Sequence, residues 1–333
     1  MTLLHRSTLA IFAGGALAQP SVAQAPAPPR LALPIACVVG QTCEIQNYVD
    51  RDLGPGAKDY RCGTRTYDGH SGLDIRLNDL AAQKRGVDVL AAADGKVLRV
   101  RDGVADISVK DIGAVAVKNQ ECGNGLVIEH AGGLSTQYCH MAKGSLTVKP
   151  GDFVRVGQPI GRVGLSGNTE YPHLHLTVKQ GDVVIDPFAP AAGGKSDQCG
   201  SGNDLWRPDA RVALAYKTRV VLNVGFAGGP VTMQQVEAGG LPAPGAAPAT
   251  LVAYVRALGL KAGDLPILTL TDPSGKILAA SAREPLPRDQ AQRLLYVGKA
   301  RPGPGWAKGR YRANYKVERE GTVVLERGFD LAL

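Results

Sequence analysis

Apolar and polar residues alternate in short runs along most of the chain, and glycine- and proline-rich turns separate the runs. Because successive side chains of a strand point to opposite faces, this alternation predicts half-buried β-strands rather than long helices. In the first half of the chain, the turn signals between the runs predict hairpins. Their strands are expected at residues 87–92 with 96–100, 126–129 with 135–140, and 174–178 with 183–185.

The second half of the chain, taken here as residues 206–333, shows the same alternation but contains neither histidine nor cysteine. About seven strands over such a length predict an antiparallel β-sandwich. A proline- and alanine-rich stretch at 238–249 predicts a long surface loop. No residue of this half indicates any chemistry. The strands are expected at residues 211–224, 250–255, 267–270, 276–280, 294–297, 311–317 and 323–333.

The predicted organisation is a mostly β protein in which an antiparallel sheet domain precedes the sandwich. Ahead of both, Arg6 and a following apolar stretch predict a secretory signal that is cleaved after Ala23 or, alternatively, after Ala25. The apolar stretch is too short to span a bilayer, so we expect an exported protein, periplasmic or extracellular, without stable membrane insertion. The predicted segments are a signal at 1–23, a Pro/Ala tether at 24–36, the sheet domain at 37–190, a linker at 191–204 and the sandwich at 205–333. Residues 24–29 of the tether are expected to be extended and poorly packed.

Composition narrows the class of protein without selecting a function. The 333 residues are 44% hydrophobic and 20% charged, which excludes a collagen, a coiled coil and a multi-span membrane protein. The formal net charge of +8 suits an anionic partner such as a cell-wall polymer. A nucleic-acid partner is not expected, because the basic residues are scattered, aromatic residues make up only 5% and the chain is predicted to be exported.

The chain has six cysteines, and in an exported protein an even number predicts disulfides rather than a metal or redox role. Spacing alone leaves many pairings open. Two cysteines near residue 40 are close enough to close a small loop, and two others flank the turn at 131–133 almost symmetrically. The remaining two would tie the flanks of the first domain together. We therefore expect the bridges Cys37–Cys43, Cys122–Cys139 and Cys62–Cys199.

The chain has six histidines, and all except the one in the predicted signal lie between residues 70 and 175. His173 and His175 are expected on one face of a strand, with Leu174 on the other face. A spacing of four places His70 and Asp74 on one side of either a strand or a helix. Imidazole and carboxylate are standard zinc ligands, although each pair alone also fits a solvated surface pair.

Two further histidines have different expected roles. His140 closes the strand at 135–140, and its neighbour Cys139 should face the other way, available for a disulfide and not for a metal. His130 follows Glu129 at the edge of a turn. We expect His130 to be a solvated turn residue without a role at the metal, and Glu129 to face the opposite side.

Taken together, these motifs resemble the lysostaphin/LytM-type zinc metallopeptidases, which are peptidoglycan endopeptidases with the duplicated-hybrid-motif fold. The match runs in order over about residues 67–187 and says nothing about residues 206–333. The matching segments are His70-Ser-Gly-Leu-Asp74, 91–97, 123–130, Tyr138-Cys-His140, 154–161, 166–169 and 172–175.

The resemblance implies that His70, Asp74 and His175 hold one zinc ion per chain, and that His140 and His173 are the catalytic pair beside it. Three protein ligands leave a fourth zinc position open for a water molecule, whose pKa the metal lowers to about 7. One imidazole would take the proton of the water, and the other would stabilise the oxyanion or protonate the leaving amine. The sequence leaves open which histidine does which.

The implied function is an exported zinc metalloendopeptidase that hydrolyses peptide crosslinks or bridges of peptidoglycan. One alternative is a catalytically silent envelope protein that binds or activates other cell-wall hydrolases, and another is a zinc peptidase that acts on proteins. The complete set of ligands and histidines favours the enzyme.

The chain also departs from the family pattern. It has extra residues at 77–85 and 102–120, and it has the pair Glu170-Tyr171 where small residues are more usual. Inserts at strand ends usually shape the rim of a groove. In a latent form, Asn47 or Asp50 could block the fourth zinc position.

Overall fold

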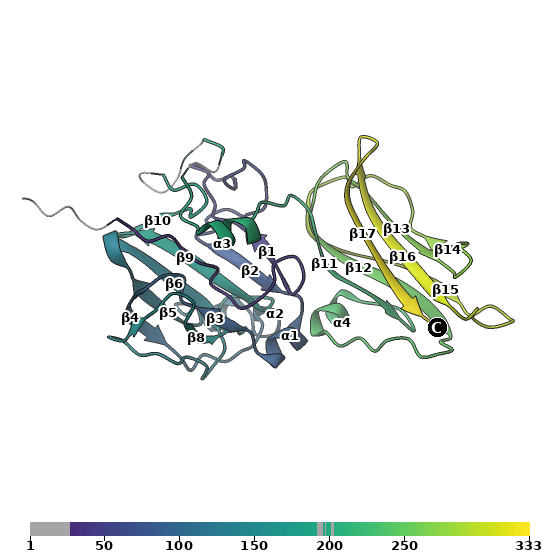
Figure 1. Ribbon diagram of the computed structural model, residues 1–333, viewed down its shortest axis with the longest axis horizontal. Helices are drawn as coiled ribbons and strands as arrows, with labels where there is room; N and C mark the ends of the chain where they lie inside the picture. The colour runs from purple at the N-terminus through teal and green to yellow at the C-terminus, as the bar shows by residue number, and fades with distance from the viewer. Residues whose placement is uncertain (1–26, 192–195, 197, 201–202) are drawn as a thin grey trace, which may run out of the picture.

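The computed structural model describes residues 27–191, 196, 198–200 and 203–333. The predicted signal at 1–23 and part of the predicted linker lie outside these residues. The described chain is mostly β, with antiparallel sheets in both halves, which confirms the predicted fold class (Figure 1). None of its described helices has the length and apolar character needed to cross a bilayer.

The first half builds an antiparallel sheet in the order β1-β2-β9-β6-β5-β4-β7, and β10 also pairs with β9. A separate small sheet pairs β3 with β8. The strands of the first half are β1 (Cys43–Asn47), β2 (Leu73–Leu77), β3 (Asp88–Leu90), β4 (Gly95–Arg101), β5 (Asn124–Glu129), β6 (Leu134–Met141), β7 (Phe153–Val154), β8 (Pro159–Arg162), β9 (His173–Gln180) and β10 (Val183–Ile185).

Alternation along β9 explains how this sheet divides its two faces. Leu174, Leu176 and Val178 are buried in the core of the first half. The intervening side chains of His173 and His175 point the other way, as the sequence predicts. The sheet therefore offers one apolar face to the core and one polar face to a cleft.

The predicted hairpins are confirmed for two pairs of strands and wrong for the third. β5 pairs with β6 and β9 pairs with β10, both antiparallel. β3 and β4, in contrast, do not pair with each other although they flank the Asp94-Gly95 turn. β3 joins β8 and β4 joins β5 and β7, because the chain between β3 and β4 changes from one sheet to the other.

The second half is a sandwich of two antiparallel sheets. Among the described residues one sheet has the order β11-β12-β15 and the other the order β14-β13-β16-β17. Side chains from both sheets form a shared core that includes Leu268, Tyr311 and Tyr315. The strands are β11 (Val220–Ala227), β12 (Thr250–Leu260), β13 (Leu265–Thr271), β14 (Ile277–Ala280), β15 (Gln290–Ala300), β16 (Arg310–Arg319) and β17 (Thr322–Ala332).

Helices are short, and one of them corrects a predicted strand. The expected strand at 211–224 begins as α3 and becomes β11 only from Val220. Pro208 stands in the first turn of α3, where its missing N–H is not needed. The described helices are α1 (Leu80–Arg85), α2 (Val109–Ile112), η1 (Ala114–Val117), η2 (Ala131–Gly133), α3 (Pro208–Ala213) and α4 (Met233–Ala238).

The core of the first half extends beyond its predicted limits at both ends. Leu31 and Ile35 lie within the predicted tether at 24–36 and are fully buried, so packed residues begin before the predicted domain start at residue 37. Leu31 forms a parallel bridge with Trp206. Trp206 and Leu214 also pack in this core, past the predicted boundary at residue 205.

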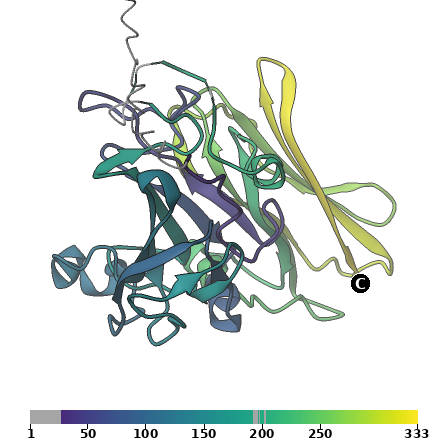
Figure 2. The ribbon, with the colours of Figure 1, turned by 60° about the vertical axis from the view of Figure 1, so that its left-hand side comes forward.

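The three predicted disulfides are present: Cys37–Cys43, Cys62–Cys199 and Cys122–Cys139. The two halves lie side by side, with β1, β2 and α1 on one side of the seam and β11, β12 and α4 on the other (Figures 1 and 2).

Candidate metal centre

A cleft of about 680 Å³ lies over the polar face of the first sheet. β2 brings Asp74 to it, β6 brings His140, and β9 brings His173 and His175. In the antiparallel register Asp74 lies opposite His175. His70 precedes β2, and its Nε2 lies 3.1 Å from the Asp74 carboxylate. The fold thus brings all the predicted site residues together.

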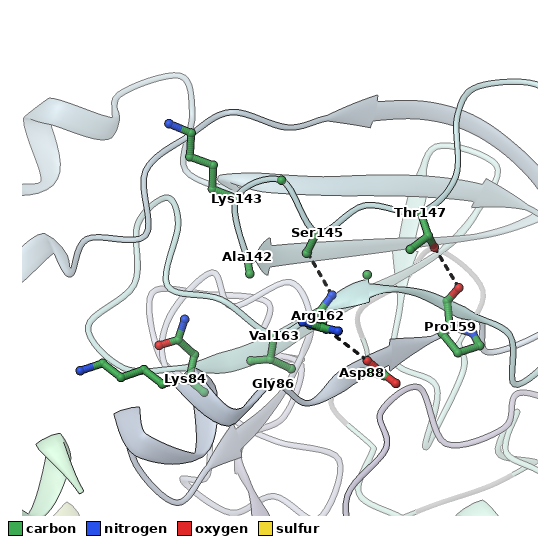
Figure 3. Close-up of a pocket in the computed structure, with 13 residues that line it drawn as sticks. Lys84, Gly86, Asp88, Ala142, Lys143, Ser145, Thr147, Pro159, Arg162 and Val163 are labelled. Carbon is green, nitrogen blue, oxygen red and sulfur yellow. Dashed lines mark hydrogen bonds and ion pairs between the residues drawn. The ribbon is translucent and has the colours of Figure 1, made fainter.

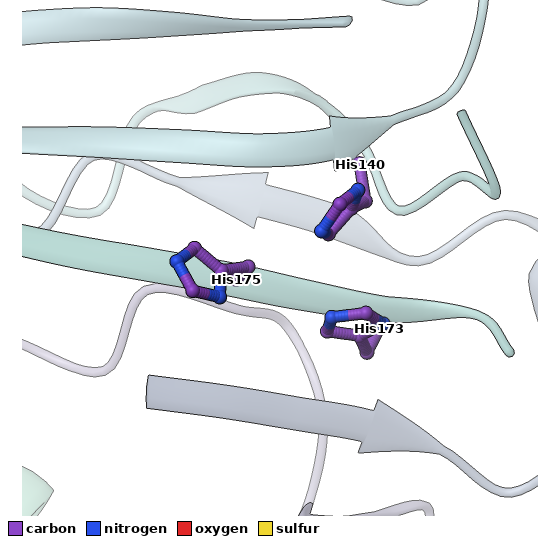
Figure 4. A group of neighbouring side chains, drawn as sticks. All are labelled: His140, His173 and His175. Atoms are coloured by element: carbon purple, nitrogen blue, oxygen red, sulfur yellow. The ribbon is translucent and has the colours of Figure 1, made fainter. Parts of the chain in front are cut away.

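Two overlapping groups of these side chains could hold a metal ion. One group is His70, Asp74 and His175, and the other is His140, His173 and His175. In each group the ligand atoms lie within 4.8 Å of one another. Figure 4 shows the three imidazoles of the second group gathered beside β9.

Hydrogen bonds orient the imidazoles of the first group. Nδ1 of His70 lies 2.6 Å from the carbonyl oxygen of Tyr48, which can only accept, so Nδ1 carries the proton and Nε2 is left with its lone pair. Nε2 of His175 lies 3.1 Å from the Thr177 hydroxyl, and its Nδ1 lies 2.8 Å from Asp74 Oδ1. Such second contacts typically fix the ring and tautomer of a metal-ligating histidine.

His140 and His173 are anchored in the same way. Nδ1 of His140 donates to the carbonyl of Ser166 at 2.8 Å, and Nδ1 of His173 lies 3.0 Å from the carbonyl of Tyr171. Both rings therefore keep Nε2 as an acceptor that faces the cleft. The ring centroids of His140 and His173 are 4.6 Å apart.

The pKa values of the site residues are shifted in different directions. Burial and then the nearby imidazoles hold the pKa of His140 well below its ordinary value. Burial lowers the pKa of His175 as well. Burial opposes the charge of His70, but the charge of Asp74 outweighs it and raises the pKa of His70. Although burial opposes ionisation of Asp74, the charges of His70 and His173 hold the pKa of Asp74 well below its usual range.

His140 departs from the predicted strand geometry. Its φ is 61°, in the left-handed region that non-glycine residues rarely adopt. Strict alternation places Cys139 on the opposite face from His140, yet both residues line the cleft. The backbone N–H of His140 donates to the carbonyl of Cys122 at 2.8 Å, so the Cys122–Cys139 bridge holds the loop that accepts this bond.

His130 is buried, which corrects the expectation of a solvated turn residue. Its Nδ1 lies 2.8 Å from the carbonyl of Asp94, and its Nε2 lies 2.8 Å from the Thr136 hydroxyl. Burial lowers the pKa of His130. His130 therefore joins two turns as a buried structural residue, and it is not among the described residues that line the cleft.

Residues other than the predicted ligands and catalytic histidines also line the cleft. Asn47 donates from Nδ2 to Asp74 Oδ2 at 2.8 Å. Asp50, which the sequence offers beside it, is absent from the described lining of the cleft and accepts backbone N–H groups instead. Ala291 and Gln292 come from the sandwich, in which the sequence indicates no chemistry. The sequence pattern within each strand does not indicate that β15 packs near the strands of the first sheet, because these strands are far apart in the sequence.

A second hollow, of about 640 Å³, lies over β3 and β8 (Figure 3). Lys84, Lys143 and Arg162 line it, and Arg162 pairs with Asp88 at 3.7 Å. Its described lining contains no histidine or cysteine. The imidazole chemistry of the chain is therefore concentrated in the cleft.

Comparison with known proteins agrees with this geometry. Residues 68–187 match the sequence profile described as "Peptidase family M23". This match confirms the resemblance to the lysostaphin/LytM-type peptidases over that part of the chain. The match leaves the sandwich outside the family domain.

Curated relatives are similar over the same part. The chain is 35% identical over 109 residues to peptidoglycan DD-endopeptidase ShyB of Vibrio cholerae, covering 33% of this chain and 20% of that protein. It is 28% identical over 121 residues to cell division protein DipM of Caulobacter vibrioides, covering 36% of this chain and 16% of that protein. The chain thus spans about a fifth of the length of these relatives or less.

Among solved structures, a zinc containing peptidase from Vibrio cholerae is 28% identical, with a TM-score of 0.28, covering 46% of this chain and 39% of that one.

Proposed function

We propose that this chain is an exported zinc metalloendopeptidase that hydrolyses peptide crosslinks or bridges of peptidoglycan. One observation carries the proposal: two overlapping ligand groups share His175, and the backbone carbonyl that holds each ring of His140 and His173 engages Nδ1 and not Nε2. An M23 domain and a curated relative named as a peptidoglycan DD-endopeptidase support the reaction class.

His70, Asp74 and His175 would hold one zinc ion. The donor set fits, because zinc takes imidazole nitrogens and carboxylate oxygens, and three protein ligands are the number found in catalytic sites. His70 offers Nε2 and His175 offers Nδ1, since the other nitrogen of each ring is engaged. When bound, zinc lowers the pKa of a water molecule and polarises a carbonyl group.

His140 and His173 would move protons beside the metal. Each ring is held with Nδ1 as donor to a backbone carbonyl, so each Nε2 can accept a proton from the cleft. Nε2 of His173 also lies 3.3 Å from Asp74 Oδ1, which would stabilise this ring when it is protonated. The protonated ring can then stabilise developing negative charge or donate to the leaving amine.

The substrate and the compartment are also part of the proposal. A peptidoglycan peptide fits a polar cleft and a formal net charge of +8, since the wall is anionic. The predicted signal and the disulfides fit an exported protein. The alternatives are a peptidase of proteins and a silent envelope protein that binds other hydrolases.

Digestion of purified sacculi, compared with digestion of casein, tests the proposal. We expect the full chain to release soluble peptides with new amino groups from sacculi and to leave casein intact, and His140→Ala to release none. Digestion of casein but not of sacculi would show that the substrate is protein and not peptidoglycan. Binding of sacculi without release of peptides would contradict the enzyme and support the catalytically silent envelope protein.

A further inference from the structure

One end of the cleft is built by the second half of the chain. Ala291 and Gln292, at the start of β15, line the same cleft as the histidines. Gln292 Oε1 accepts a hydrogen bond from Arg76 at 3.1 Å. Arg76 lies opposite His173 in the pairing of β2 with β9. The sandwich therefore reaches the strand pair that carries the predicted catalytic histidine.

Arg76 also holds an aromatic ring in place. Its guanidinium carbon lies 4.0 Å from the centroid of the Tyr171 ring, a cation–π distance. The Tyr171 ring in turn lies 5.0 Å from the ring of His173. Tyr171 is half-buried and belongs to the pair that departs from the family pattern. Tyr171 thus contacts both Arg76, which binds Gln292 at the end of the cleft, and His173.

Polar contacts between the two halves of the chain hold this end of the cleft, formed by Gln292 and Arg76, in place. Arg76 and Arg256, both buried, form ion pairs with the same carboxylate, that of Glu237 on α4. Arg256 also donates to the carbonyl of Asn78. A wall held by buried charges on both sides is preorganised, which reduces the entropy that binding must offset.

The free groups at this end are hydrogen-bond donors. The oxygen of the Gln292 amide accepts from Arg76, which is the hydrogen bond that this side chain makes among the described residues, and the amide nitrogen is left to donate. The Tyr171 hydroxyl accepts from Asn47 Nδ2 at 3.4 Å and keeps its own proton to donate, and burial raises its pKa so that it stays protonated. Donors select acceptors, and a peptide offers these as carbonyl and carboxylate oxygens.

We propose that Gln292 and Tyr171 form a substrate subsite, positioned by Arg76, that binds acceptor oxygens of the peptidoglycan peptide beside the scissile bond. This inference rests on the proposed function and deepens it, because it gives the sandwich a part in substrate selection. Gln292 touches the substrate in this subsite, while Arg76 acts through Gln292 and Tyr171.

Gln292→Glu tests the subsite. Glutamate keeps an oxygen for Arg76 and replaces the donating amide with a second acceptor. With a soluble crosslinked muropeptide dimer as substrate, we expect KM to rise about tenfold, the loss of roughly one hydrogen bond, and kcat to stay within about twofold. Tyr171→Ala should raise KM in the same direction. Lys299→Ala, on the exposed far end of β15, is the matched control and should leave both constants unchanged.

A binding measurement separates this inference from the proposed function. Calorimetric titration of the dimer into His140→Ala, with and without Gln292→Glu, should give a Kd about tenfold weaker in the double variant. If the native chain leaves the dimer intact, the proposed function is wrong, and the Kd of the native chain with and without Gln292→Glu still reports the subsite. An unchanged Kd for Gln292→Glu overturns the subsite.

Comparison of KM for the free dimer and for the dimer with amidated terminal carboxyl groups identifies the substrate oxygen that Gln292 binds. An equal rise in KM for the free and the amidated dimer assigns Gln292 to a backbone carbonyl. A larger rise for the free acid assigns it to a carboxylate, because the new glutamate would repel that charge. Either result supports the subsite, whereas a rise of the same size in Lys299→Ala would contradict it.

Discussion

Asp186 shows how a single side chain can carry a charge-dependent penalty far from the cleft. It is completely buried, and its Oδ2 has no hydrogen-bond partner among the described residues. Oδ1 accepts the backbone N–H of Phe188 at 2.9 Å. Burial raises the pKa of Asp186 to about 7.

This pKa predicts that the contribution of Asp186 to stability falls as the pH rises from about 4 to about 7. The folded chain binds a proton on Asp186 over this window that the unfolded chain has released, so the free energy of unfolding decreases by up to about 4 kcal/mol. Asp186→Asn, which keeps the oxygen that faces Phe188, should flatten this dependence in urea unfolding curves at pH 4, 5.5 and 7. An unchanged slope in Asp186→Asn, equal to that of the exposed control Asp111→Asn, would refute the assignment.

At the scale of elements, the pairing of β2 with β9 sets the geometry of the site. The register that places Asp74 opposite His175 requires a close approach before β2. Gly72 provides it: a Cβ there would lie 2.5 Å from His175 Nε2 and 2.7 Å from the carbonyl of Leu176. A backbone carbonyl cannot move aside cheaply, so only glycine fits.

Gly72→Ala is therefore expected to displace His175. We expect weaker zinc binding, by about tenfold or more, together with a loss of stability of about 2 kcal/mol from overpacking. Competition with a chromophoric chelator measures the first effect and thermal unfolding the second. Gly328→Ala, where a Cβ meets nothing within 4 Å, is the control, and equal zinc affinity in the two variants would contradict the steric account.

The same scale shows what could be predicted from sequence. The alternation in β9 and the four-residue spacing of His70 and Asp74 correctly predicted which of these side chains lie together, because both depend on local periodicity. The hairpin of β3 with β4 was wrong, since a turn signal does not reveal that the chain changes sheets. His130 was predicted to be solvated, but burial depends on the distant Asp94 turn that packs over it.

At the scale of the molecule, the seam between the halves has no local signal at all. Arg76, Glu237 and Arg256 are separated in sequence by other elements and meet only in the fold. Burial lowers the pKa of Arg256 to about 10, which still leaves it charged. One carboxylate thus holds two buried guanidinium groups, and its removal leaves both without their partner.

Glu237→Gln should consequently destabilise the folded chain by about 3 kcal/mol, because breaking a buried ion pair leaves uncompensated charge. Urea unfolding measures this value. Glu326→Gln, which removes a solvent-exposed pair with Lys316, is the control and should leave stability close to that of the native chain. Similar values for the two variants would show that the seam does not depend on this carboxylate.

Zinc content and sacculus digestion, measured on one preparation each of the native chain, His175→Ala and His140→Ala, test the central claim most directly. We predict one zinc per chain in the native protein and in His140→Ala, loss of zinc in His175→Ala, and digestion by the native protein alone. Absence of zinc from the native protein, or digestion that persists in His140→Ala, would contradict the account.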